Sequence, residues 1–298
     1  MNAWSHSRVH CGFPMLTAIT RDVSPAIVRC QLSFIDRKPI DLRQAREQHR
    51  AYEKLLSKLG ARVISLPSEP DLSDSMFVED PAIVLDEIAV ILPLGTESRR
   101  REAASLAQEL AKYRKLAYVE LPGTLEGGDV LHIGRKLFVG LTKRSNAEGI
   151  RQLGEILRRY GYELIPVQVT GCLHLKSAVT WIADNTLLAN RAWFDSKPFA
   201  GYEWIEVDPS EPHAANALAL GGTILFPASF PKTRGRIDSL HFASQRSIFP
   251  SSRKRNPASP APAWFLKVPL LNAGSRFAGG GSSDPLLLGL CNLASSYG

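Results

Sequence analysis

Residues 82–94, AIVLDEIAVILPL, decide the fold class. Two apolar runs flank Asp86 and Glu87, so this stretch predicts two buried strands joined by a tight turn. Such a hairpin is an antiparallel pair, whereas a TIM barrel or a doubly wound sheet places single parallel strands between helices. The stretch therefore favours another α/β architecture, in which hairpins recur.

The elements around this hairpin repeat along the chain. Each expected helix leads to an expected strand: 41–59 to 62–67, 98–113 to 117–122, and 146–160 to 163–169. A short polar motif and a hairpin follow each strand, and the hairpins turn near residues 86, 134, 184 and 221. A spacing of about 45 residues is typical of repeated architecture. Radial stacking of these units predicts an α/β propeller with the motifs gathered at one end of its axis.

Composition excludes several classes of protein. The 298 residues are 44% hydrophobic and 22% charged, as in ordinary globular domains. No apolar run approaches the roughly 20 residues of a membrane-spanning helix, and the start of the chain lacks the apolar stretch of a signal peptide. A cytoplasmic protein with no membrane partner is expected. The four cysteines form no CxxC pair, so Cys30 and Cys172 are expected to be buried free thiols, not metal ligands.

The positive charge lies mainly near the end of the chain. Residues 241–298 carry +5 of the formal net charge of +7 and are rich in Pro, Ser and Arg. This distribution does not indicate a folded basic face, so no nucleic-acid partner is expected. We expect a flexible extension over 1–14, a folded domain over 15–240, and an aberrant, disordered tail over 241–298.

The motif before the first hairpin, DSMFVED (74–80), concentrates three carboxylates: Asp74, Glu79 and Asp80. The apolar residues between them would draw the loop inward, in contrast to a solvated acidic turn. Buried carboxylates need a cationic partner. A guanidinium ligand would supply one with forked hydrogen bonds.

Two further motifs occupy the same place in the next units. In LEGGDV (125–130), paired glycines between Glu126 and Asp129 indicate close backbone approach or an unusual turn. In CLHLKS (172–177), His174 is a candidate general acid or base because it shares its position with the acidic motifs. A lone histidine among apolar residues is otherwise usually structural.

Arg99 and Arg144 follow the first two hairpins, each near the start of an expected helix. A cation there is mildly unfavourable for the helix dipole. This placement favours another use, such as holding a carboxylate.

In order and spacing, FVED, LEGGDV, LTKRSN and LHLKSAVT resemble the dimethylargininase (dimethylarginine dimethylaminohydrolase) family. The resemblance runs from about Met15 to Leu240 and implies a five-bladed α/β propeller, the pentein fold, built of repeated ββαβ units. It also implies hydrolysis of an N-methylated arginine to citrulline and a methylamine through a Cys-His mechanism. It implies neither a metal ion nor an organic cofactor, and it says nothing of the oligomeric state.

The resemblance also assigns roles to residues. His174 would act as acid and base, and Glu126 would orient it. Leu32 would belong to a lid loop over the substrate. The expected substrate-binding side chains are those of Asp74, Glu79 and Asp80 around the guanidino and amino groups, and of Arg99 and Arg144 around the α-carboxylate.

The resemblance stops before the nucleophile. The family ends in a pattern close to S-E-x-x-K-x-E-G-x-x-T-C-x-S-L, and its cysteine attacks the guanidino carbon. No such stretch is present here, and Cys291 lacks the Thr before it and the Ser-Leu after it. The chain as written is therefore expected to be inactive, with its last strand missing or altered.

A shifted reading frame accounts for this departure. When the third base of each codon is joined to the first two of the next, residues 246–266 permit V-D-I-S-E-L-x-E-K-E-S-G-L-T-C-x-S-L-V-F. That string matches the family ending in content and position, except for Glu at the usual Lys and Ser at the usual Gly, with a Gly one position later. A frameshifted gene or a sequencing error would also explain the acid-poor tail.

Two other functions remain open. One is a non-catalytic protein that binds arginine or methylarginine with its carboxylates but has lost its thiol. The other is an arginine deiminase-like hydrolase, because only the shape of the pocket distinguishes the two substrates.

Sequencing the coding DNA across codons 236–298 tests the shifted frame. We expect one or two bases to be missing or extra, so that the corrected protein ends in a Thr-Cys-x-Ser-Leu strand. A fully active hydrolase made from the chain as written would refute this explanation.

Overall fold

The hairpin unit predicted from the sequence recurs in the computed structural model, which describes residues 16–31, 39–220 and 223–244. The expected extension at 1–14, the lid residue Leu32 and the tail from residue 245 onward lie outside the described residues. No helix in the described part of the chain has the length and apolar character needed to cross a bilayer.

Three sheets share one design. In each, the first strand pairs antiparallel with the second, and the second pairs parallel with the third. The antiparallel pairs are the predicted hairpins. The sheets contain β3 (Ala82–Val84), β4 (Ile88–Ile91) and β5 (Lys115–Tyr118); β6 (Val130–Ile133), β7 (Lys136–Leu141) and β8 (Glu163–Gln168); and β9 (Val179–Ala183), β10 (Thr186–Ala189) and β11 (Glu203–Glu206).

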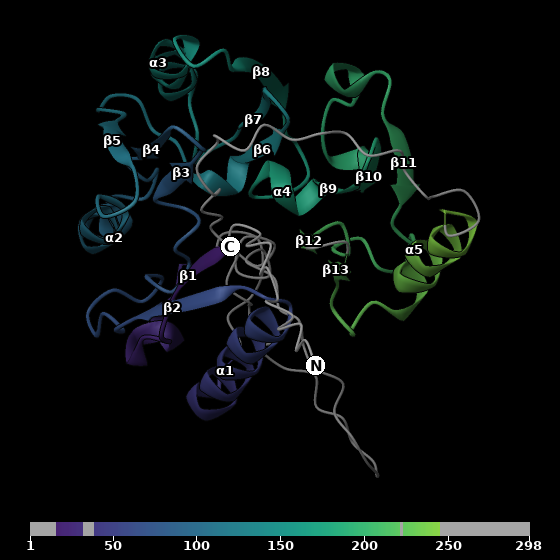
Figure 1. Ribbon diagram of the computed structural model, residues 1–298, viewed down its shortest axis with the longest axis horizontal. Coiled ribbons are helices and arrows are strands. Elements are labelled where there is room, and N and C mark those ends of the chain that lie inside the picture. Colours follow the sequence, from purple (N-terminus) through teal and green to yellow (C-terminus); the bar gives the residue numbers. More distant parts are fainter. Residues whose placement is uncertain (1–15, 32–38, 221–222, 245–298) are drawn as a thin grey trace, which may run out of the picture.

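Two smaller sheets use parts of the same design. Strands β12 (Leu218–Leu220) and β13 (Thr223–Leu225) form an antiparallel pair on either side of the expected turn at 221–222. Strands β1 (Thr17–Arg21) and β2 (Arg62–Leu66) are parallel, like the last two strands of a unit. The five sheets lie around a common centre (Figure 1). The expectation of an altered last strand concerns residues outside the described part.

Two of the expected helices are confirmed. Helix α1 (Leu42–Lys58) begins at Asp41, whose carboxylate accepts hydrogen bonds from the backbone N–H groups of Arg43 and Gln44. The chain leaves this helix through Gly60, whose φ of +90° suits a residue without a Cβ. Helix α3 (Ala147–Arg158) begins at Asn146, which caps it in the same way.

The third expected helix, 98–113, is wrong as a continuous element. The structure has a 3₁₀ segment, η2 (Glu97–Glu102), followed by the short helix α2 (Ala103–Leu110). Side chains three residues apart are eclipsed in a 3₁₀-helix. That geometry places Arg99 beside Glu102, to which it donates hydrogen bonds. The ion pair therefore favours the tighter turn.

Other boundaries also differ from expectation. Strand β5 ends at Tyr118, before the expected end at residue 122, where Pro122 has no N–H to donate to a ladder. Helix α5 (Pro231–Ser244) continues past the expected domain end at residue 240. Between β10 and β11 the chain forms two 3₁₀ turns in place of a helix, η4 (Arg191–Trp193) and η5 (Lys197–Phe199).

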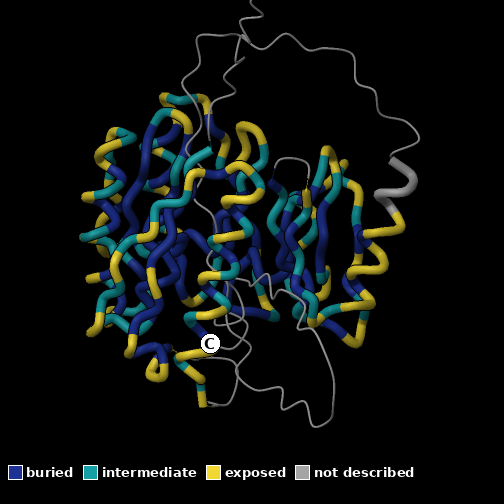
Figure 2. The backbone as a smooth tube through the Cα atoms, turned by 60° about the horizontal axis from the view of Figure 1, so that its bottom comes forward, coloured by how far each residue is buried: buried dark blue, intermediate teal, exposed yellow. Residues whose placement is uncertain are grey.

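Burial follows the strands, while the outer helices expose one face to solvent (Figure 2). Each hairpin contributes apolar side chains to clusters between neighbouring sheets. In one cluster, Phe138 of β7 stacks on Phe199 of η5, with ring centroids 4.2 Å apart. Both rings are fully buried. The same cluster contains Leu131 of β6 and Val179 of β9, the strands that follow two of the polar motifs.

Replacing Phe138 by Ala should lower the free energy of unfolding by about 3–5 kcal/mol, because the change opens a cavity against Phe199. Urea unfolding measures the effect. The matched control is Tyr118→Ala on β5, where the side chain is 54% exposed and the expected change stays within about 1 kcal/mol. Equal losses in the two variants would contradict this description of the core.

Candidate active site

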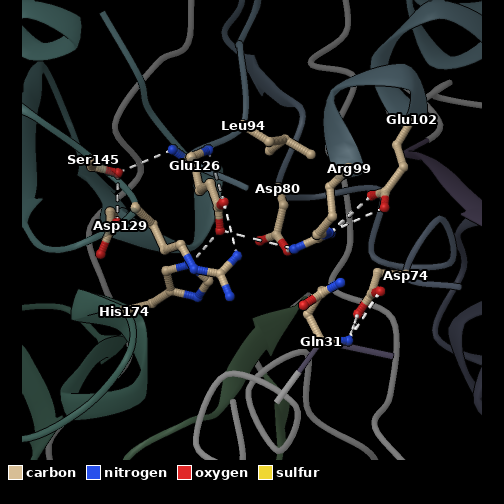
Figure 3. Close-up of polar contacts among 12 residues, drawn as sticks. Gln31, Asp74, Asp80, Leu94, Arg99, Glu102, Glu126, Asp129, Ser145 and His174 are labelled. Atoms are coloured by element: carbon tan, nitrogen blue, oxygen red, sulfur yellow. Dashed lines mark hydrogen bonds and ion pairs between the residues drawn. The ribbon is translucent and has the colours of Figure 1, made fainter. Parts of the chain in front are cut away.

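The polar motifs meet because each immediately precedes the first strand of a unit. Asp80 lies before β3, and Glu126 leads through the 3₁₀ turn η3 (Gly127–Asp129) into β6. His174 precedes the short helix α4 (Leu175–Ala178), which continues into β9. Equivalent positions in neighbouring units face the same centre, so residues far apart in sequence become neighbours (Figure 3).

Glu126 and His174 form a buried pair. The His174 Nε2 atom lies 2.7 Å from Glu126 Oε2, and both side chains are almost fully buried. Burial alone would raise the pKa of Glu126, but the hydrogen bond and charge of His174, with Arg99 and Arg144, lower it to about 2. Burial likewise opposes charge on His174, but Asp129 and Glu126 outweigh it and raise the pKa of His174. The pair therefore favours a protonated imidazole, the form that can donate a proton.

Both expected arginines lie at this site and hold carboxylates of the protein itself. Arg99 Nη1 donates to Asp80 at 3.0 Å, while its Nε and Nη2 atoms donate to Glu102. Arg144 Nη1 donates to Glu126 Oε1 at 3.2 Å. All of these side chains are buried. Carboxylates and guanidinium groups thus alternate across the site (Figure 3).

The remaining expected carboxylates have different surroundings. Glu79 forms a buried ion pair with Lys176 of α4. Asp74 is 2% exposed and accepts hydrogen bonds from the backbone N–H of Gln31 and the hydroxyl of Ser73. Within the described residues, no Lys, Arg or His nitrogen lies within 4.0 Å of Asp74. Among the three carboxylates predicted to bind substrate, Glu79 and Asp80 form ion pairs. Asp74 accepts hydrogen bonds but forms no ion pair with the described residues.

The paired glycines provide the close approach that their motif predicts. A Cβ on Gly127 would collide with the backbone carbonyl of Glu79, and a Cβ on Gly128 would lie 2.6 Å from His174 Nδ1. Both positions therefore require glycine. Gly127 thus allows the FVED loop, and Gly128 the His174 ring, to contact the LEGGDV loop closely.

Sequence reasoning missed three residues that support the site. Asp129 Oδ1 accepts from the N–H of Leu175, while Oδ2 accepts from the hydroxyls of Thr142 and Ser145. Asp129 therefore joins three motifs. The positions of Asp129 in LEGGDV and of Lys176 in LHLKS could have indicated a role at the site. The residues that they contact lie far away in the sequence, however, so these contacts could not be predicted. Glu102 was detectable as the residue three positions after Arg99.

The described cysteines are structural thiols. Cys30 and Cys172 are buried thiols that form no disulfide, as expected. Burial and the nearby Asp129 raise the pKa of Cys172 to about 12. Its Sγ atom donates to the His174 carbonyl oxygen at 3.2 Å. A thiol with such a pKa supplies little thiolate at neutral pH, so Cys172 is unsuited to nucleophilic attack.

One group of residues has the spacing of metal ligands. Donor atoms of Asp80, Glu126 and His174 lie within 4.8 Å of one another. Arg99 and Arg144 already pair with the two carboxylates. The cluster therefore has counter-charge without a metal ion.

Comparison with known proteins identifies similar enzymes. A family model described as arginine deiminase matches residues 48–215. The N(G),N(G)-dimethylarginine dimethylaminohydrolase of Pseudomonas aeruginosa is 33% identical over 204 residues, 68% of this chain and 80% of the relative. The corresponding protein of Streptomyces coelicolor is 36% identical over 221 residues, 74% and 85% of the two chains.

The structural similarity covers the same region. A solved structure of the Pseudomonas aeruginosa enzyme, a cysteine-to-serine mutant in complex with citrulline, aligns with a TM-score of 0.72 and 31% identity. The alignment covers 76% of this chain and 90% of the other. It confirms the pentein fold expected from the sequence.

Replacing Gly128 by Ala should displace the His174 ring from Glu126 and lower the pKa of His174, which NMR titration of the imidazole measures. The overpacking should also cost about 1–3 kcal/mol of stability. A raised histidine pKa stabilises the folded state below the ordinary value of 6.5, and this contribution is lost as pH rises through the folded-state pKa. The variant should therefore lose more stability below pH 6.5 than at high pH.

The control for this variant is Gly154→Ala. A Cβ on Gly154 of α3 would meet only Leu164 Cδ2, at 3.7 Å. Alanine in a helix stabilises by roughly 0.5–1 kcal/mol relative to glycine. An unchanged His174 titration in Gly128→Ala would show that the ring does not depend on this close approach.

Proposed function

Because the chain belongs to the dimethylarginine dimethylaminohydrolase family, we propose that its site binds the guanidino group of an N-methylated arginine. The family hydrolyses amidines, and the products here would be citrulline and a methylamine. A guanidinium is planar, delocalised and a poor electrophile. Its hydrolysis therefore needs carboxylates to hold it, a thiolate to attack the central carbon, and an acid to protonate the leaving amine.

The observation that carries this proposal is the environment of Asp74. A buried carboxylate is costly unless it is paired, and hydrogen bonds from Ser73 and Gln31 bring no positive charge to it. Its carboxylate also lies close enough to Arg99 to influence that group's titration. A guanidinium bound at Asp74 would complete the alternation of charges across the site.

His174 fits the role of the acid. Asp129 and Glu126 favour its protonated form, and Gly128 leaves room for its ring beside Glu126. In the proposed reaction, a thiolate adds to the guanidino carbon, and the C–N bond to the methylamine breaks. His174 gives its proton to the departing nitrogen. It then takes a proton from a water molecule that adds to the same carbon, and the C–S bond breaks, which releases citrulline and regenerates the thiolate.

The chain as written would bind this substrate without turning it over. Cys30 and Cys172 are buried, and burial with the nearby Asp129 raises the pKa of Cys172 to about 12. The expected nucleophile lies in the alternative reading of codons 246–266. In that reading the cysteine lies two residues before the run S-L-V-F, as His174 and Asp80 lie shortly before strands of their own units. We propose that the corrected chain is the active hydrolase and that the printed chain is a binding protein.

An arginine deiminase-like reaction is the second candidate, because the matching family model carries that description. The two reactions share the site and differ in the leaving group, ammonia or a methylamine. Identification of the amine released by the frame-corrected chain separates them.

Asp74→Asn tests the binding proposal on the printed chain. We expect calorimetry to detect N,N-dimethylarginine bound to the parent protein and at least a tenfold weaker affinity in the variant, because a charge-assisted hydrogen bond contributes roughly 1.5–3 kcal/mol. Asp71→Asn is the matched control: it removes an equal charge from an exposed turn three residues away. Equal affinities of the parent and Asp74→Asn would contradict the proposed binding site.

A further inference from the structure

Arg99 lies among more carboxylates than it can neutralise. Its Nε and Nη2 atoms donate to Glu102 at 2.9–3.2 Å, and its Nη1 atom donates to Asp80 at 3.0 Å. Burial opposes the charge of Arg99, but the surrounding carboxylates, Asp74 among them, raise its pKa well above the ordinary value. Figure 3 shows these three carboxylates around the one guanidinium. This part of the site therefore holds an excess of negative charge.

The other cations near this group have partners of their own. Arg21 of β1 lies close enough to Glu102 to be influenced by its charge, but its Nη1 atom pairs with Glu69 at 3.1 Å. His174 pairs with Glu126. Among the described residues, Arg99 alone lies within 4.0 Å of the Glu102 carboxylate. The excess charge is therefore not balanced from another loop.

Glu102 can relieve this excess by binding a proton. Its side chain is almost fully buried and faces Arg99, with the carboxylates of Asp74 and Asp80 nearby. Burial raises the pKa of Glu102, Arg99 opposes the change, and the two carboxylates add to it, so that the pKa reaches about 7. A protonated carboxyl group has lost part of its acceptor capacity and no longer matches the forked donors of an arginine. Protonation of Glu102 thus loosens its hold on Arg99.

Asp80 is the alternative place for this proton. Burial raises its pKa as well. Two cations act on Asp80, however, because both Arg99 and His174 favour its ionised form. A proton there would also lie near His174, which itself favours the protonated form. Glu102 is therefore the better acceptor.

A bound guanidinium changes the balance around Glu102. Bound at Asp74, as proposed above, it brings one positive charge among the carboxylates. A nearby cation favours the ionised form of a carboxyl group. Glu102 then loses its proton and accepts from both the Nε and Nη2 atoms of Arg99. Citrulline has the same amino acid end but a neutral ureido group, so it leaves the proton in place.

We propose that Glu102 exchanges a proton for the substrate guanidinium: it releases the proton to solvent when the cation binds, and takes it back when neutral citrulline is bound instead. Glu102 acts through Arg99 and is a positioning residue that does not touch the substrate. The exchange keeps the charge of the site nearly constant and favours substrate over product as pH rises. This inference rests on the proposed function and adds proton coupling to it.

Calorimetry of the full printed chain in buffers of different ionisation enthalpy measures the released protons. At pH 7, N,N-dimethylarginine should release up to about half a proton per site more than citrulline, since a group with a pKa of about 7 is half protonated there. The two ligands share their α-amino and α-carboxylate groups, so proton changes at that end cancel. Equal release by the two ligands would overturn the proposal.

The exchange also makes the affinity for substrate depend on pH. The guanidinium binds better when Glu102 is ionised, so its affinity rises as pH rises through the pKa of the ligand-free protein. If binding lowers that pKa by about one unit, N,N-dimethylarginine binds about fivefold tighter at pH 8 than at pH 6, relative to citrulline. A ratio of the two affinities that stays constant over this range would contradict the exchange.

Glu102→Gln keeps the shape of the side chain but holds it in a neutral state. The variant should release no more protons with N,N-dimethylarginine than with citrulline, and the ratio of the two affinities should no longer change with pH. Glu97→Gln is the matched control, because it removes an equal charge from an exposed position of the same 3₁₀ segment. This control should behave like the parent protein.

The outcomes separate the possible sources of the proton. If Glu102→Gln releases as many protons as the parent protein, another group such as His174 or Asp80 supplies them, and the proposal is refuted. If the parent protein binds neither ligand, the proposed function fails and this inference fails with it.

A second measurement needs no substitution, in case Glu102→Gln does not fold. Infrared difference spectra of the parent protein should show the carbonyl stretch of a protonated carboxyl group disappearing when N,N-dimethylarginine binds, but not when citrulline binds. Labelling the glutamate carboxyl groups with ¹³C should shift this band. A band that stays in place would assign the proton to an aspartate such as Asp80, and this result or the lack of any band would overturn the proposal.

Discussion

The buried carboxylate of Glu126 is the interaction on which the site depends. It accepts hydrogen bonds from Gly95 and Arg144 through one oxygen and contacts His174 through the other. The backbone N–H of Glu126 is in turn held by the hydroxyl of Ser145. A carboxylate without water must be surrounded by donors. The positions of Arg144, His174 and the loop at Gly95 all satisfy that requirement.

The repeated architecture makes such a concentration of buried charge possible. Each unit delivers one polar loop to the centre and surrounds it with apolar strands that pack on the neighbouring units. Arg99 and Arg144 come from other loops than Asp80 and Glu126, and each arginine pairs with one of these two carboxylates. Asp129 joins its own loop to the loop that follows β7 in the same unit, through Thr142 and Ser145, and to the loop of the next unit, through Leu175. The polar network and the apolar clusters therefore support the same arrangement.

Much of this arrangement could be predicted from sequence because its signals are local. Local sequence patterns predict the hairpin at 82–94, the helix cap at Asp41 and the close backbone approach at the glycine pair 127–128. The equivalent positions of Asp80, Glu126 and His174 in successive units predict that they meet. The 3₁₀ segment before α2 was not predicted, although Glu102 lies three positions after Arg99, because the contact of Arg99 with Asp80 of another loop leaves no local pattern. The partner of Lys176 lies 97 residues earlier in the chain, so no local pattern indicates it.

The contacts of the site have a consequence for how the chain folds. The pairs Glu79–Lys176 and Glu126–His174 join residues 97 and 48 positions apart, so they form only after the intervening sheets are in place. Contacts between distant residues are slow to form, because loop closure must precede them. Until then the carboxylates and cations remain hydrated separately. The charged centre is therefore expected to lose its water late in folding, when the neighbouring sheets dock. Before that stage, contacts among the apolar strands must stabilise the partly folded chain without the ion pairs.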